Sequence, residues 1–382
     1  MKKYLAMILA AGMTLGLVAC SGGGTTSAPA ASSAASEAVS EAAEAASEAA
    51  EAASTAASEA AEAASEAVDA DGGYADKTVG VCIYQFSDNF MTLYRNELQS
   101  YLESLGFASA NIKIVDGAND QATQTNQIQN FITEGVDVLI VNPVNSSSAA
   151  SITDLVTDAG IPLVYINREP DADEEARWES EGMNVTYVGC DARQSGTMQG
   201  EIIGDLGLEA IDFNGNGKID YIMVEGDPEN VDAQYRTEFS VKALEDAGFE
   251  VNCLVDQVGN WQQEQGQQIV ANALAQHGND VEVVFCNNDA MALGAVQAIE
   301  AAGRVVGEDI YLVGVDALTE ACEYVISGQM TGTVFNDHIS QAHSAADAAV
   351  NFIDGRGNDY YIGCDYVKVT TDNAQATLDS LK

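Results

Sequence analysis

Acidic and amide side chains follow apolar segments at five points along the sequence. These side chains are Asp88, Asn167, Asn288, Asp316 and Asn336. Carboxylates and amides offer planar acceptors and donors, and they match hydroxyl groups because a hydroxyl both donates and accepts a hydrogen bond. One such position is common in proteins, whereas five of them at segment ends predict a single cleft that collects hydroxyl-binding groups.

Two aromatic residues and one arginine extend this set. Phe90 lies two residues after Asp88, Trp261 lies in the polar stretch 259–262, and Arg236 is one of few arginines. An aromatic ring stacks well on the apolar C–H face of a sugar, so we expect Trp261 to contact a ligand. The alternatives are a place in the core for Trp261 and a surface ion pair for Arg236.

Residues 212–220 follow the pattern of a calcium-binding loop, with a glycine at the sixth position. The oxygen-bearing side chains at its first, third, fifth and ninth positions are Asp212, Asn214, Asn216 and Asp220. Calcium takes about six to eight oxygen ligands, and this loop supplies most of them. Met223 stands where an EF-hand has its bidentate glutamate, so that carboxylate must come from elsewhere in the fold. A calcium here would be structural, and the alternative is an Asn- and Gly-rich turn without a metal.

No catalytic motif accompanies these residues. The sequence has no G-x-S-x-G, H-E-x-x-H or Walker loop, and it holds only 3 histidines. Asp88, Asp232 and Asp316 could be considered as a glycosidase pair, but carboxylates in a cleft rich in amides fit binding better. We therefore expect a binding protein rather than an enzyme.

Apolar, β-branched segments alternate with helix-like segments from Lys77 onward. We expect strands at 79–86, 112–115, 136–141, 161–166, 185–188, 219–224, 281–286 and 310–315, with helices that include 90–105, 124–133 and 149–159. This alternation predicts an α/β fold of right-handed βαβ units with parallel sheets, which bind ligands at the carboxyl ends of their strands. Residues 77–382 exceed the size that one core usually covers, so two lobes are expected.

The first residues carry a secretory signal and a lipid-attachment pattern. Lys2 and Lys3 precede an apolar run, and residues 17–20 end in Cys20. We expect residues 1–19 to be a signal peptide and Cys20 to be the lipidated first residue of the mature protein, anchored to the outer face of the cell membrane. An incidental cysteine after an ordinary signal is the alternative. Residues 20–76 are rich in Ala, Ser and Glu and predict a solvated stalk.

Charge and cysteine usage narrow the partners. The chain carries 59 acidic and 15 basic residues, a net charge of −44, which excludes nucleic acid as a partner because a phosphate backbone would be repelled. Besides Cys20 there are six cysteines, and none lies in a CxxC pair. Six cysteines allow about 15 pairings that a sequence cannot distinguish, and buried free thiols are our expectation.

Three stretches resemble the periplasmic galactose/glucose-binding proteins. They are V-G-V-C-I-Y-Q-F-S-D-N-F-M at 79–91, N-N-D-A-M-A-L-G-A at 287–295 and V-G-V-D-A-L at 313–318. The resemblance extends through 226–236 and 332–337 and covers nearly all of 77–372. It implies a type I periplasmic-binding fold of two Rossmann-like lobes, 77–190 plus 337–367 and 191–336 plus 368–382. Three crossover strands would join these lobes near 189–191, 336–337 and 367–370.

The resemblance also assigns roles to individual residues. It implies that Phe90 and Trp261 sandwich a sugar, and that its hydrogen bonds come from Asp88, Asn167, Asp232, Arg236, Asn288, Asp316 and Asn336. It further implies a calcium site formed by Asp212, Asn214, Asn216, the Lys218 carbonyl and Asp220, with Glu282 as the bidentate ligand. Asn230 stands where the family has a sugar-bonding histidine, which leaves glucose against galactose open. Asn216 and Asp220 exchange acid and amide relative to the family loop.

The function that follows is capture of a hexose and its delivery to an ABC transporter permease. The protein would be a monomer that closes around its ligand and touches the membrane only through its anchor. The alternative is a sensory module that presents bound sugar to a chemoreceptor or histidine kinase.

Overall fold

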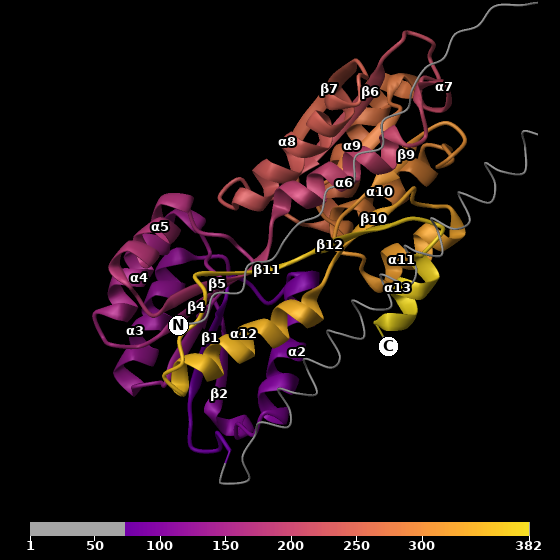
Figure 1. Cartoon of the computed structure of the whole chain (residues 1–382). Helices are drawn as coiled ribbons and strands as arrows, with labels where there is room; N and C mark the ends of the chain where they lie inside the picture. Colours follow the sequence, from indigo (N-terminus) through magenta and orange to yellow (C-terminus); the bar gives the residue numbers. More distant parts are fainter. Residues whose placement is uncertain (1–72, 382) are drawn as a thin grey trace, which may run out of the picture. The chain divides into compact units, whose positions relative to one another are not determined.

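A computed structural model describes residues 73–381 (Figure 1). The predicted signal peptide, Cys20 and nearly all of the predicted stalk lie outside the described residues. Within the described part, none of the helices is both long and apolar enough to cross a membrane.

The first lobe is built on six parallel strands in the order β11-β5-β4-β3-β1-β2. The strands are β1 (Val79–Ile83), β2 (Ile112–Asp116), β3 (Val138–Val141), β4 (Leu163–Ile166), β5 (Val185–Cys190) and β11 (Tyr361–Cys364). Its helices are α2 (Asn89–Ser104), α3 (Gln121–Glu134), α4 (Ala149–Thr157), α5 (Ala172–Glu181) and α12 (His338–Ile353).

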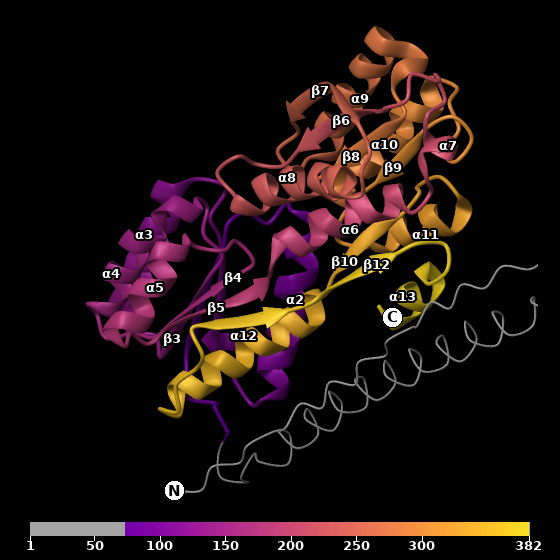
Figure 2. The ribbon, with the colours of Figure 1, turned by 45° about the horizontal axis from the view of Figure 1, so that its top comes forward.

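Helices cover both faces of this sheet, which is why its strands are apolar throughout. Successive side chains point to opposite faces, so Val81 packs with α2 and α12, whereas Cys82 packs with α3, α4 and α5. Figures 1 and 2 show α12 beside α2, although residues 105–337 separate them in sequence.

The second lobe has four parallel strands in the order β7-β6-β8-β9. They are β6 (Ile219–Glu225), β7 (Val251–Val258), β8 (Val283–Cys286) and β9 (Tyr311–Val313), and isolated bridges connect this region to the antiparallel pair β10 (Thr333–Asn336) and β12 (Tyr366–Val369). The helices are α6 (Ala192–Gly204), α7 (Leu208–Ile211), α8 (Val231–Asp246), α9 (Gln263–His277), α10 (Asp289–Ala301), α11 (Thr319–Ser327) and α13 (Ala374–Ser380). Residues of α9, α10, α11 and α13 share one core, and residues of α6 and α8 share another.

The chain passes between the lobes at three points. They lie between β5 and α6 at Asp191, between β10 and α12 at Asp337, and between β11 and β12 at Asp365. We expected the third crossing near 367–370, but Tyr366 and Val367 already pair with Asn336 and Phe335 of β10. The strand pairing therefore begins just after Asp365.

The predicted α/β fold with parallel sheets is confirmed, and each of the eight predicted strand ranges overlaps a strand. The helices that follow several strands begin at acidic or amide caps, as helix N-termini require. Asp88 caps α2 by accepting from the Met91 N–H at 2.7 Å, and Asn288 caps α10 by accepting from the Met291 N–H at 3.0 Å. The same side chains thus start the helices and lie at the carboxyl ends of the strands.

Candidate functional site

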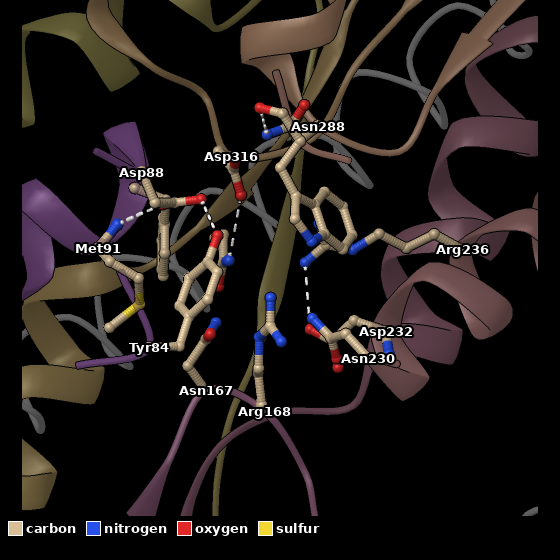
Figure 3. Close-up of a pocket in the computed structure, with 13 residues that line it drawn as sticks. Tyr84, Asp88, Met91, Asn167, Arg168, Asn230, Asp232, Arg236, Asn288 and Asp316 are labelled. Carbon is tan, nitrogen blue, oxygen red and sulfur yellow. Dashed lines mark hydrogen bonds and ion pairs between the residues drawn. The ribbon is translucent and has the colours of Figure 1, made fainter. Parts of the chain in front are cut away.

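One cavity between the lobes gathers all ten residues that we predicted for the sugar site. Its lining consists of Asp88, Phe90, Asn167, Asn230, Asp232, Arg236, Trp261, Asn288, Asp316 and Asn336, together with Tyr84, Met91 and Arg168 (Figure 3). The space among these side chains is about 320 Å³. Because that space includes volume open to solvent, it is the lining side chains that indicate the class of ligand.

The first lobe contributes Asp88, Phe90, Asn167 and Arg168. The Asp88 carboxylate accepts from the Tyr84 hydroxyl at 2.6 Å, in addition to capping α2. Asn167 follows β4 and accepts from the Asn142 side-chain amide at 3.1 Å. Phe90 is buried on α2, with the ring of His338 edge-on to it at 6.3 Å.

The second lobe contributes a buried ion pair and a tryptophan. Arg236 donates to the Asn287 carbonyl at 2.8 Å and to the Tyr366 hydroxyl at 3.1 Å, and it lies 3.5 Å from the Asp232 carboxylate. Its guanidinium carbon is 5.7 Å from the centre of the Trp261 ring. Trp261 is only 8% exposed and lies in the cavity wall rather than in a purely apolar setting.

Three further side chains of this lobe are fixed by local hydrogen bonds. Asn230 caps α8 by accepting from the Asp232 N–H at 3.0 Å. Asp316 accepts from the Asn336 amide at 3.2 Å, and Asn336 in turn accepts from the Gln341 amide at 2.6 Å. Each side chain is therefore held in place before a ligand binds, which lowers the entropic cost of binding.

Direct contacts hold the two lobes together beside the cavity. The Arg168 guanidinium, from the first lobe, lies 3.2 Å from the Asp227 carboxylate of the second lobe. The Ser146 N–H donates to the Glu229 carbonyl at 3.3 Å across the same boundary. Both contacts join loops at the carboxyl ends of strands, so the described arrangement is a closed one.

Several buried polar atoms in this wall have no hydrogen-bond partner within the described protein. They are Asp232 Oδ1, Arg236 Nε, Trp261 Nε1 and the Nε and Nη2 atoms of Arg168. A buried polar atom without a partner costs about 1–3 kcal/mol. A ligand with several hydroxyls supplies both donors and acceptors, so it can satisfy such atoms on both lobes at once.

The backbone at the cavity is strained. Asn167, Trp261 and Asp316 have φ angles of 61°, 65° and 121°, which residues other than glycine seldom adopt. Such angles cost about 1–3 kcal/mol each and cluster where side chains must be aimed at a ligand. Three of the predicted ligand residues therefore point into the cavity because the chain pays a local conformational cost.

Burial shifts the acid–base properties of two carboxyl groups in the wall. It raises the pKa of Asp316 to about 7 and that of Asp232 to about 6, although Arg236 opposes both shifts. Each carboxylate is therefore costly to keep charged in the protein alone. A hydroxyl donor from a ligand would stabilise the charged form.

The predicted calcium loop folds around Asp220 and Glu282. The side-chain amides of Asn214 and Asn216 donate to Asp220 Oδ2 at 2.8 and 2.6 Å. The buried Glu282 carboxylate accepts from the N–H groups of Asn214 and Asp220 at 3.1 and 3.0 Å. Four of the predicted ligand residues therefore form one connected cluster: Asn214, Asn216, Asp220 and Glu282.

Asp212 and Lys218 join this cluster through the backbone. The Asp212 carboxylate accepts from the N–H groups of Asn216 and Gly217, both at 2.9 Å, and the Lys218 N–H donates to Asn216 Oδ1 at 2.8 Å. Among residues 73–381, no three His, Cys, Asp or Glu side chains are arranged as a ready metal group. The side-chain amides of Asn214 and Asn216 donate to Asp220 instead.

The donor types of this loop nevertheless fit calcium. Carboxylates and amide carbonyls are the hard oxygens that calcium prefers. Burial raises the pKa of Glu282, and the neighbouring Asp220 charge adds to that effect, so a cation would relieve both. Rotating an amide group by half a turn exchanges its nitrogen and oxygen, which would direct the oxygens of Asn214 and Asn216 inward.

Tyr84, Met91 and Arg168 are the lining residues that sequence reasoning missed. Arg168 is 1% exposed, and its guanidinium lies 3.7 Å from the centre of the Tyr84 ring. Its position directly after Asn167, at the carboxyl end of β4, is the signal that could have identified it. Tyr84 lies within the predicted strand 79–86, and the apolar pattern of that strand does not indicate that the Tyr84 hydroxyl lines a cavity.

Two lobes with parallel sheets, three crossings and a polar cavity between them define a two-lobed solute-binding protein. The profile of the family described as periplasmic binding protein domain matches residues 79–357. The chain belongs to this family. Its members are solute-binding proteins rather than enzymes, and the family places the chain outside the cytoplasm.

The chain is similar to proteins that differ in ligand. It is 32% identical over 313 residues to the D-galactose/methyl-galactoside binding periplasmic protein of Haemophilus influenzae, which covers 78% of this chain and 91% of that one. It is 35% identical over 300 residues, with the same two shares, to a protein of Rhizobium meliloti assigned to rhizopine binding. A solved ABC transporter solute-binding protein of Bacillus halodurans with bound myo-inositol is 29% identical, with a TM-score of 0.69 and coverage of 81% of this chain and 99% of that one.

Proposed function

We propose that this protein is the sugar-binding component of an ABC transporter and that it captures a hexose, galactose or glucose, in the cavity between its lobes. The observation that carries the proposal is the set of buried, unpartnered polar atoms on both sides of that cavity. A galactose-binding relative among the similar proteins agrees with this choice.

Binding follows from the placement of these groups. Asp88 and Asn167 on the first lobe and Asp232, Arg236, Asn288, Asp316 and Asn336 around the second would bond the hydroxyls. Phe90 and Trp261 would cover the two faces of the ring. Because one ligand bonds both lobes, it shifts the population toward the closed arrangement, and the closed form docks on the permease.

A cyclitol such as myo-inositol is the second candidate, and Arg168 favours it. This buried arginine adds two unpartnered donor atoms to the cavity wall. A cyclitol has as many oxygens as a hexopyranose, but each of them is a hydroxyl on a ring carbon, so hydroxyl acceptors point to every side of the ring, including the side that faces Arg168. The similarity to the myo-inositol-bound structure points in the same direction.

Delivery to a chemoreceptor or histidine kinase, in place of import, is the alternative use of the same binding event. The lobes would serve either partner, so the genes beside this one, for a permease or for a kinase, distinguish the two. The anchor at Cys20 and the monomeric state belong to the same proposal and rest on the sequence.

A structural calcium in the loop 212–220 is also part of the proposal. Asp212, Asn214, Asn216, the Lys218 carbonyl, Asp220 and Glu282 would hold it. The ion would brace the loop against β6 and β8, because Asp220 and Glu282 belong to or adjoin those strands. The raised pKa of the buried Glu282 supports the need for a cation there.

Thermal denaturation of the full chain with a panel of D-galactose, D-glucose, D-ribose and myo-inositol tests the ligand. We expect a higher midpoint with galactose or glucose, and isothermal titration calorimetry then ranks their affinities. A shift with myo-inositol alone would replace the hexose by the cyclitol. A shift with ribose alone, or with none of these polyols, would overturn the proposed ligand class.

A further inference from the structure

Two cysteines face each other where the first lobe ends. Cys190 is the last residue of β5, Cys364 is the last residue of β11, and the two are partners in the parallel register of these strands. Neighbouring strands lie about 4.8 Å apart. A disulfide needs Cα atoms about 4.4–6.8 Å apart, so the backbone spacing already permits one.

The two cysteines are direct neighbours in the sheet. Both are free in the structure, and the register of β5 and β11 pairs their residues. The neighbouring thiol lowers the pKa of Cys364, whereas the Cys364 thiol and burial raise the pKa of Cys190. Cys364 is therefore the thiol that more readily forms the attacking thiolate.

The difference in exposure also favours Cys364 as the thiol that reacts first. Cys190 is 3% exposed, whereas Cys364 is half-buried between the exposed residues Gly363 and Asp365. An oxidant can reach Cys364 from solvent, and Cys190 lies behind it as the second thiol. The four other described cysteines are Cys82, Cys253, Cys286 and Cys322, all free, and each lies on a different element from the next.

The pair also lies at the hinge. Asp191 and Asp365, which directly follow the two cysteines, are two of the three points where the chain crosses between the lobes. The hydroxyl of Tyr366, the next residue, accepts a hydrogen bond from the Arg236 guanidinium at 3.1 Å and so joins the network of the cavity. A covalent bond at this place would tie two of the three crossing segments together.

We propose that Cys190 and Cys364 form a redox-sensitive pair that closes to a disulfide within the first lobe, at the base of the hinge. The oxidant is a small-molecule disulfide such as oxidised glutathione. The Cys364 thiolate attacks one of its sulfurs, which forms a mixed disulfide and releases one glutathione thiolate. Cys190 then loses its proton and attacks Cys364 Sγ, which releases the second glutathione, so the two cysteines are oxidised by two electrons and two glutathiones are the reduced products.

The bond is tested by mass spectrometry of the full chain. Reduced protein is incubated with oxidised glutathione, the remaining thiols are alkylated, and the chain is digested without reductant. We expect a peptide that links Cys190 to Cys364. In Cys190→Ser we expect a glutathione adduct on Cys364 instead, whereas Cys253→Ser should form the link as the wild type does.

The alkylation pattern decides the outcome. Recovery of both cysteines as separate alkylated peptides, or a link between any other two cysteines, would overturn the proposal. Cys190→Ala repeats the test should Cys190→Ser not fold. Hydrogen exchange of residues around Asp191 and Asp365 should slow in the oxidised wild type and in oxidised Cys253→Ser but stay unchanged in Cys190→Ser, and this readout needs no sugar.

Discussion

The cavity between the lobes and the loop 212–220 are both rich in carboxylates and amides, yet they pair them in opposite ways. In the loop, Asp220 accepts from Asn214 and Asn216, and Glu282 accepts from two backbone N–H groups. In the cavity, comparable groups on Asp232 and Arg236 keep atoms without partners. The polar groups of the loop bond to one another, whereas the cavity wall keeps polar atoms that the described protein does not pair.

The difference arises from what positions the side chains. The loop is one short segment whose residues can turn toward each other. The cavity residues are held apart by separate helix starts and by strained backbone at Asn167, Trp261 and Asp316. A self-satisfied loop keeps its shape before an ion binds, but the cavity reaches its full set of hydrogen bonds only with a ligand from outside.

Removal of the Trp261 ring should have the largest effect on ligand binding in the cavity. We expect Trp261→Ala to abolish measurable hexose binding in calorimetry, because the variant loses the ring that would cover one apolar face of the sugar. Gly226→Ala should act in the same direction, since an added Cβ would lie 2.1 Å from the Trp261 ring.

The control for these two variants is Gly204→Ala, where the new Cβ would meet Phe249 at an ordinary 3.4 Å. Its affinity should equal that of the wild type. Unchanged affinity in Trp261→Ala would remove the tryptophan from the ligand site.

Chelation tests the loop half of the comparison. If calcium is bound at about 100 times its dissociation constant, its removal should lower the free energy of unfolding by about 2.7 kcal/mol. Denaturant titration of the full chain with calcium or with a chelator measures this difference. We expect Glu282→Gln to be insensitive to chelator.

The hydrogen bonds within the loop make the opposite result informative. A wild-type midpoint that is the same with and without chelator would show that the amides of Asn214 and Asn216 are the loop's lasting partners. The loop would then be a turn rather than a metal site.

Ligand affinity in the cavity should depend on pH. The binding free energy should change by about 1.4 kcal/mol per pH unit for each proton that ligand binding releases. The pKa of Asp316 is about 7 and that of Asp232 about 6. A ligand hydroxyl donates to the charged form, so affinity should rise from pH 5 to pH 8 and binding should release protons below about pH 7.

The free energy of unfolding should fall over the pH range in which the ligand affinity rises. The raised pKa values mean that the folded protein binds protons that the unfolded chain has lost, so stability falls as pH rises from about 4 to 7. Calorimetry of Asp316→Asn should show a flatter pH profile of affinity, with the exposed Asp158→Asn as the matched control. A wild-type affinity that does not change between pH 5 and pH 8 would contradict this assignment.

The sequence predicted the cavity residues well because parallel sheets bring the carboxyl ends of their strands to one edge. Asp88, Asn167, Asn288 and Asp316 each follow a strand, so their convergence required only the order of elements. Arg168 escaped notice because its role depends on the path of its long side chain past Tyr84. No local pattern encodes that path.

The same limit applies to strands and to cysteines. β7 lies at the edge of its sheet with most of its side chains partly or fully exposed, so it has no apolar run to detect. The pairing of Cys190 with Cys364 depends on the register of two strands that are far apart in sequence. Composition predicts that thiols exist, but only the fold pairs them.

The smallest expected effect concerns Asn230, where the galactose/glucose-binding proteins that the sequence resembles have a histidine. Asn230 caps α8 through the Asp232 N–H, so Asn230→Ala should cost about 1 kcal/mol of stability. Asn230→His removes the same cap but adds a ring donor beside Asp232. If the natural ligand is a hexose, this variant should bind galactose or glucose at least as tightly as the wild type and more tightly than Asn230→Ala. If the ligand is a cyclitol, the histidine should weaken myo-inositol binding, because its imidazole ring is larger than the amide and would take up space in the cavity.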